Sequence, residues 1–211
     1  MMDSLQHWAG LCFTIRQVSR FMSQHGHQYE RKTKFKELQA AWLFGLLLSR
    51  NNREEYLICF PVANDSPEDS KTILREIIDQ NIALDEDFDM VITPKKKAHR
   101  MNHKLQIVRF TGDVEKTPQG LFDFLRKKKF NIPKDENLLL LVWLEKGLKL
   151  NYIELGQKLR QVDVPYGQIF MVGETKRNEL NIFFCLKVFP EIIRFKDLDL
   201  SFLKSPRKAK P

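Results

Sequence analysis

The amino-acid sequence predicts an α/β fold in which a mixed central β-sheet is flanked by helices. Two kinds of segment follow one another along the chain. Some have apolar residues at helical spacing, and others are short runs, either continuously apolar or with every second residue apolar, that are typical of strands. The predicted order is helix, strand, helix, hairpin, helix, strand, helix and two strands. A mixed sheet covered by helices buries all of these apolar faces in one domain. The content of 43% hydrophobic and 29% charged residues is ordinary for such a globular chain.

The N-terminal part of the chain is predicted to be helical. Apolar residues spaced by threes and fours predict a helix over about 4–24, and Gly26, in a polar stretch, is expected to end it. Thr33 is a plausible N-cap for a second helix that ends near Ser49.

A strand and a third helix follow. The compact apolar run 56–62 predicts a buried strand. Ser66 and Pro67, followed by two acidic residues, have the cap and first-turn composition of a helix start. The apolar spacing extends this helix to about Asn81.

A hairpin is the most informative prediction. Both 87–92 and 104–110 alternate apolar with polar or charged residues, as half-buried strands do. The link between them, 93–103, is polar, basic and contains a proline. The hairpin therefore holds Asp89 on its first arm and Gln106 on its second, beside a cationic loop.

The second half of the chain continues the same pattern. The predicted elements are helix 117–129, strand 138–144, helix 152–161, and strands 169–172 and 180–188 with a turn at 174–179. Together these elements divide the chain into an N-terminal helical extension (1–30), an α/β domain (31–203) and a basic tail (204–211).

The formal net charge of +8 favours anionic partners, and nucleic acid above all. Each basic cluster taken alone reads as a solvated face or a frayed end. Their joint occurrence around one acidic hairpin favours nucleic acid. The clusters are 31–36, 95–104, 126–129 and 207–210.

Several classes of protein are disfavoured. No apolar run reaches the roughly 18 residues needed to span a bilayer, and no signal-peptide pattern opens the chain, so we expect a cytoplasmic protein without a membrane partner. Cys12, Cys59 and Cys185 are widely separated in apolar contexts and are expected to be reduced core residues. The sequence lacks a Gly-rich phosphate loop, a nucleophile elbow and a zinc-protease helix motif, which disfavours kinases, such hydrolases and zinc proteases.

Over roughly 32–144, the order of elements and the polar residues of the hairpin resemble the PD-(D/E)XK nuclease superfamily. The resemblance implies a restriction-endonuclease-like fold and a metal-dependent DNA endonuclease. It implies that Asp89 is the first acid, that Gln106 stands at the second acidic position, and that Glu37 is the extra helical acid. Asp89 and Gln106 would then help to hold Mg²⁺, which prefers oxygen ligands.

One residue departs from the superfamily pattern, because Val108 stands where the catalytic lysine is expected. Lys104, two residues before Gln106 and on the same strand face, is the nearest replacement. Three functions remain open: a metal-dependent endonuclease with a degenerate active site, an inactive nuclease-like module that binds DNA or a protein as a regulator, or a small host-interaction or regulatory protein whose basic patches contact an acidic protein. Val108 favours the second.

The phosphate contacts are predicted independently of catalysis. Lys95, Lys96, Lys97 and Arg100 lie in the hairpin link, away from any apolar pattern, and Arg109 lies on the second arm. Placed beside the acidic strand, these side chains are expected to bind nucleic acid, with DNA as the expected form.

Overall fold

The computed structural model describes residues 12–29, 32–60, 70–79, 89–97, 103–110, 117–144, 150–177 and 180–199. The chain forms two compact units, Met1–Gln106 and Ile107–Pro211. The division falls inside a strand, at a position that no change of composition marks. The predicted tail, 204–211, lies outside the described residues.

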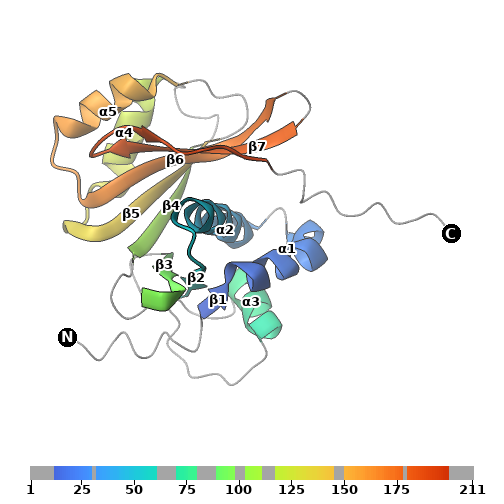
Figure 1. The fold of residues 1–211 in the computed structure, drawn as a ribbon. Helices are drawn as coiled ribbons and strands as arrows, with labels where there is room; N and C mark the ends of the chain where they lie inside the picture. The colour runs from blue at the N-terminus through green and yellow to red at the C-terminus, as the bar shows by residue number, and fades with distance from the viewer. Residues whose placement is uncertain are drawn as a thin grey trace. The chain divides into compact units, whose positions relative to one another are not determined.

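The first unit combines an antiparallel sheet with helices (Figure 1). Its strands follow one another in the order β1-β2-β3-β4, and each neighbouring pair is antiparallel. The elements are β1 Cys12–Thr14, α1 Ile15–Tyr29, α2 Thr33–Asn52, β2 Tyr56–Cys59, α3 Ser70–Asp79, β3 Met90–Pro94, the 3₁₀ turn η3 Lys95–Lys97, and β4 His103–Phe110, which continues past the unit boundary.

Helix α2 is the centre of the first unit. It packs against α1, α3, β2 and β3, and its run from Ala40 to Gly45 is buried on every side. A helix that is apolar all round belongs in a core. Gly45 permits its close packing, since a Cβ at that position would lie 2.5 Å from Cδ1 of Ile15 and 3.1 Å from Cδ1 of Ile92.

The second unit has a mixed sheet. Strands β5 and β6 are parallel, whereas β7 pairs antiparallel with β6, β8 and β9. Helices α4 and α5 pack together on one side of these strands (Figure 1). The elements are α4 Pro118–Lys129, β5 Asp135–Leu144, α5 Tyr152–Arg160, β6 Tyr166–Arg177, β7 Leu180–Phe189, β8 Ile193–Arg194 and β9 Leu198–Asp199. The predicted α/β class, with mixed pairing of strands and flanking helices, is confirmed.

The predicted N-terminal helix 4–24 is wrong in two respects, and its first residues lie outside the described ranges. A short strand precedes the helix, because Thr14 starts α1 with a reciprocal capping box: the Gln17 N–H donates to Thr14 Oγ1 at 3.1 Å, and the Thr14 N–H donates to Gln17 Oε1 at 2.8 Å. The helix also continues through Gly26 to Tyr29, where the tyrosine ring lies 6.1 Å from the rings of both Phe21 and Phe35. This aromatic packing outweighs the low helix propensity of one glycine.

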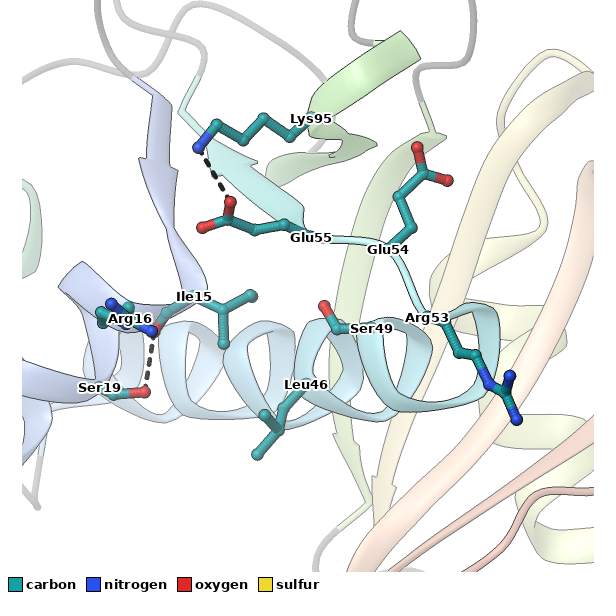
Figure 2. A pocket seen from close by; sticks show the side chains of 9 residues that line it. All are labelled: Ile15, Arg16, Ser19, Leu46, Ser49, Arg53, Glu54, Glu55 and Lys95. Carbon is teal, nitrogen blue, oxygen red and sulfur yellow. Dashed lines mark hydrogen bonds and ion pairs between the residues drawn. The ribbon is translucent and has the colours of Figure 1, made fainter.

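Helices α1 and α2 border a pocket of the first unit, together with the segment from Arg53 to Glu55 and Lys95 (Figure 2).

The predicted turn at 174–179 is too long, since β6 extends to Arg177 and pairs with β7 as far as Leu180. The predicted start of the third helix, at Ser66, lies outside the described residues.

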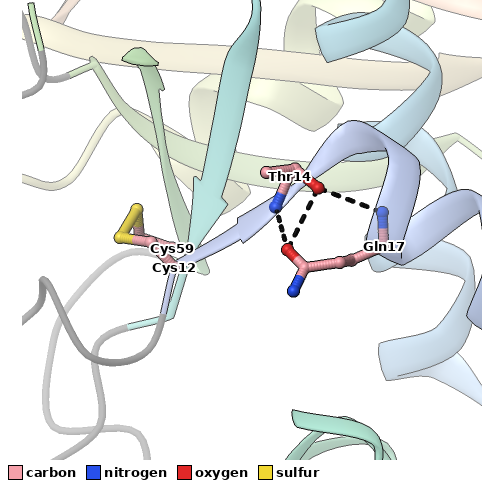
Figure 3. Close-up of a disulfide and its surroundings, with 4 residues drawn as sticks. All are labelled: Cys12, Thr14, Gln17 and Cys59. Atoms are coloured by element: carbon pink, nitrogen blue, oxygen red, sulfur yellow. Dashed lines mark hydrogen bonds between the residues drawn. A yellow bond between two sulfur atoms is a disulfide. The ribbon is translucent and has the colours of Figure 1, made fainter. Parts of the chain in front are cut away.

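The expectation of three reduced cysteines is also wrong. Cys12 and Cys59 form a disulfide that joins β1 to β2, where the two residues stand opposite each other (Figure 3). They are 47 residues apart in sequence, so spacing alone gives no sign of the pairing, which depends on strand register. Cys185 is buried and free.

Candidate functional site

The hairpin places Asp89 beside Gln106. Strands β3 and β4 pair Met90 with Leu105 and Val91 with Lys104. Asp89 lies one residue before β3, and its N–H donates to the carbonyl of Leu105 at 2.8 Å. Continuing the register by one residue sets Asp89 opposite Gln106, and residues opposite each other share a face of the sheet. The predicted neighbourhood of these two residues is therefore present.

Lys34, in the first turn of α2, links this hairpin to the helix. Its ammonium nitrogen lies 2.8 Å from Glu37 Oε2 and 3.0 Å from Asp89 Oδ1. Lys34 and Glu37 share one helix face because they are three residues apart. The structure thus joins two predicted site residues, Glu37 and Asp89, through a lysine that the sequence analysis did not select.

The cluster formed by Lys34, Glu37, Asp89 and Gln106 is partly buried. The side chains of Lys34, Glu37 and Asp89 are 20%, 13% and 20% exposed, and Gln106 is 7% exposed. Burial by itself lowers the pKa of Lys34, but the charges and hydrogen bonds of Asp89 and Glu37 outweigh it and hold that pKa above its ordinary value. Lys34 is therefore a cation at neutral pH.

Lys104 was the predicted replacement for the missing lysine. The register places it opposite Val91, two residues from Gln106 along β4 and on the same face. It is half-buried. The lysine that contacts the carboxylates of both Glu37 and Asp89 is Lys34.

The predicted phosphate contacts have different surroundings. Lys95 and Lys96 are exposed in η3, but Lys95 forms an ion pair with Glu55 at 2.9 Å. The side chain of Lys97 and all of Arg100 lie outside the described residues, as does Asp87. Arg109 belongs to the second unit and is half-buried.

The donors in the cluster suit a hard divalent cation. Mg²⁺ is usually bound through one or two carboxylates and keeps several waters, and Glu37, Asp89 and the amide oxygen of Gln106 are ligands of this kind. Within the described ranges, no group of three or more His, Cys, Asp or Glu residues is placed to hold a metal ion. Any such ion would depend on the two carboxylates, with the amide and the phosphates of a substrate completing its coordination.

Comparison of the chain with protein families, with curated proteins and with solved structures finds no match. In the part of the chain that the structure describes, none of the helices has the length and apolar character needed to cross a membrane.

Sequence reasoning missed Lys34, although a signal was present. The predicted helix start at Thr33 puts Lys34 in the first turn, three residues before Glu37, where their side chains meet. Its contact with Asp89 depends on how α2 packs beside the hairpin, which a single sequence does not state.

Proposed function

We propose that this protein binds nucleic acid, with DNA as the expected form, and that Glu37, Asp89, Gln106 and Lys34 make up a nuclease-like centre. One observation carries the proposal: the Lys34 ammonium contacts both carboxylates. The lysine that β4 lacks at Val108 is then supplied by helix α2.

The residues of this centre take different roles. Glu37 and Asp89, with the Gln106 amide, would hold Mg²⁺, which when bound makes a water molecule more acidic and thus a better nucleophile at neutral pH. Lys34 is protonated, so it serves as a fixed positive charge beside the scissile phosphate and not as a general base. Such preorganised charge stabilises the negative charge that develops during phosphodiester cleavage.

A second function, an inactive nuclease-like module that regulates through DNA or a protein partner, is favoured by the same lysine. Its single ammonium group already neutralises one of the two carboxylate charges, and Gln106 adds no charge of its own. A centre with this balance attracts a divalent cation less strongly than one with three acids. Where the module acts through DNA, the two functions share the binding surface and differ only in cleavage.

Nicking of supercoiled plasmid DNA in Mg²⁺ or Mn²⁺ separates the two. If the centre is catalytic, wild-type protein nicks the plasmid and Asp89→Asn lowers the rate by about 100-fold or more. The matched control is Asp79→Asn, which removes a carboxylate that pairs with Lys32 on the surface of the same unit. This control should leave the rate unchanged.

A gel shift with the same proteins completes the assignment. Binding of DNA by wild type without nicking in either metal supports the inactive module. Failure to bind DNA at low salt contradicts the endonuclease and the DNA-binding form of the module, and leaves an acidic protein as the partner of the basic surface.

A further inference from the structure

The pocket of the first unit is separate from the Lys34 cluster. It has a volume of about 700 Å³, which is within the range of small-molecule sites. Helix α2 carries Glu37 near its start and Ser49 near its end, and the helical rise puts these residues about 18 Å apart. The lining residues are Ile15, Arg16, Ser19, Leu46, Ser49, Arg53, Glu54, Glu55 and Lys95.

Ser49 is the first sign of a ligand. Its hydroxyl oxygen is buried and has no hydrogen-bond partner within the described residues. By contrast, the hydroxyls of Ser19 and Ser23 donate to backbone carbonyls of their own helix, at 2.8 Å and 2.9 Å. A buried polar group without a partner is costly, and Figure 2 shows this hydroxyl directed toward the segment that carries Glu55.

Arg53 is the second sign. It ends α2 in the left-handed conformation, with φ of 52°, where glycine or asparagine is usual because a Cβ is unfavourable there. Among the described residues, it is the one non-glycine residue with positive φ. Backbone conformations that are unfavourable for the residue they hold cluster at ligand-binding sites, so the conformation of Arg53 points to this end of the pocket.

The charges of the pocket favour an anion that also carries hydrogen-bond donors. Lys95 and Glu55 neutralise each other across 2.9 Å, which leaves Arg16, Arg53 and the half-buried Glu54 to set the balance. Arg16 and Arg53 stand at opposite ends of the pocket (Figure 2). Two guanidinium groups and one carboxylate suit a ligand with an anionic group and with hydroxyl or amino groups.

We propose that this pocket binds a free mononucleotide. The phosphate meets the guanidinium group of Arg53, which can bind it in a bidentate manner. The ribose hydroxyls pair with the hydroxyl of Ser49 and the carboxylate of Glu54. The base lies against the apolar side chains of Ile15 and Leu46 at the end of the pocket where Arg16 can stack on it. This proposal does not rest on the nuclease-like centre.

The test is isothermal titration calorimetry of the full chain with AMP, adenosine and inorganic phosphate as separate probes. Arg53→Gly removes the guanidinium group without destabilising the fold, since glycine readily adopts the observed backbone conformation. It should weaken AMP binding about tenfold or more, the loss expected for one charge-assisted contact, and leave adenosine binding unchanged. Ser49→Ala should weaken AMP binding without lowering thermal stability, because it removes a polar group that is already unpaired.

Two controls give the result its meaning. Arg50→Ala and Arg20→Ala each remove an exposed arginine that does not line the pocket, one from α2 and one from α1; neither should change AMP binding. The proposal is overturned if AMP fails to bind at millimolar concentration, if adenosine binds as tightly as AMP, or if Arg53→Gly and Ser49→Ala bind AMP like wild type. Tighter binding of a 5′-phosphorylated trinucleotide than of AMP overturns the free nucleotide as the ligand and assigns the pocket to a strand end.

Discussion

At the scale of single residues, the loss of the Lys34 side chain should change the stability of the Lys34 cluster most. Replacing it with methionine leaves Glu37 and Asp89 partly buried and close together without their shared cation. We expect Lys34→Met to lower the free energy of unfolding by about 1.5–3 kcal/mol, the range for hydrogen bonds that involve a charged group. Urea denaturation followed by circular dichroism measures this change in the free energy of unfolding.

The matched control is Lys36→Met, which removes a half-buried lysine two residues along the same helix. It should change the free energy of unfolding by less than Lys34→Met does, because positions two apart on a helix do not face each other and Lys36 lies off the face that Lys34 and Glu37 share. Adding Asp89→Asn to Lys34→Met should restore part of the lost stability, because it reduces the repulsion between the carboxylates of Glu37 and Asp89. Equal effects of Lys34→Met and Lys36→Met would show that the cluster contributes nothing to folding.

His103 predicts how stability depends on pH. Burial lowers the pKa of His103, and its Nδ1 atom is buried without a hydrogen-bond partner among the described residues. The unfolded chain therefore binds this proton more readily than the folded chain, so stability falls as the pH drops below the ordinary value of 6.5. The urea concentration at the midpoint of unfolding should therefore decrease as the pH is lowered from about 7.5 to about 5.

His103→Phe should reduce this pH dependence, since the variant has no group to protonate at that position. His27→Gln, which alters an exposed histidine of α1, should keep it. A wild-type midpoint that stays constant across this range would contradict the assignment.

At the scale of elements, local signals predicted most of the fold, and signals that depend on pairing were missed. Thr117 caps α4 as its sequence indicates, accepting a hydrogen bond from the Gly120 N–H at 3.0 Å. The hairpin was predicted as well, but its first strand is displaced: β3 is Met90–Pro94, it is buried throughout and does not alternate, and Thr93 and Pro94, which were expected in the link, belong to it. The three-residue strand β1 is too short to carry a period, and an apolar pattern at helical spacing concealed it. Its existence depends on pairing with β2, which is remote in sequence.

The candidate site shows the same limit. Asp89 and Gln106 were predictable because a hairpin brings neighbours in sequence together. Lys34 was not, since its position beside Asp89 follows from packing of α2 against the sheet. The disulfide was missed for the same reason, as strand register alone brings its two cysteines together.

That disulfide gives the prediction for elements. Cross-linking residues 47 apart restricts the unfolded chain, which in the chain-entropy treatment is worth about 4 kcal/mol at most. Reduced wild type, or the double variant Cys12→Ser, Cys59→Ser, should unfold at lower urea than the oxidised protein. The double variant should not respond to reductant, which is the internal control because Cys185 is free in both. An unchanged midpoint on reduction would show that β1 and β2 stay paired without the covalent link.

At the scale of the whole molecule, the positive charge is divided between the two units. The first unit carries Lys95 and Lys96 on η3, and the second carries Arg126, Lys127 and Lys128, all exposed on the last turn of α4. Cations at that end also favour the helix dipole, so their presence has a structural explanation as well as a functional one.

The expected outcome follows from counterion release. Each phosphate contact contributes about 0.9 to the slope of log affinity against log salt for duplex DNA. The triple variant Lys95→Ala, Lys96→Ala, Lys97→Ala should bind a labelled duplex more weakly and with a shallower slope in fluorescence anisotropy. Its loss should be smaller than three full contacts, because Lys95 already pairs with Glu55. Its thermal stability should change little.

The comparison variant is Arg126→Ala, Lys127→Ala, Lys128→Ala, which removes as many charges from the second unit. A shallower slope in the η3 variant alone places DNA beside the hairpin, as the proposed centre requires. A shallower slope in the α4 variant alone assigns the binding surface to the second unit. If neither variant changes affinity or slope, the net charge of +8 serves solubility, and the case for a nucleic-acid partner fails with it.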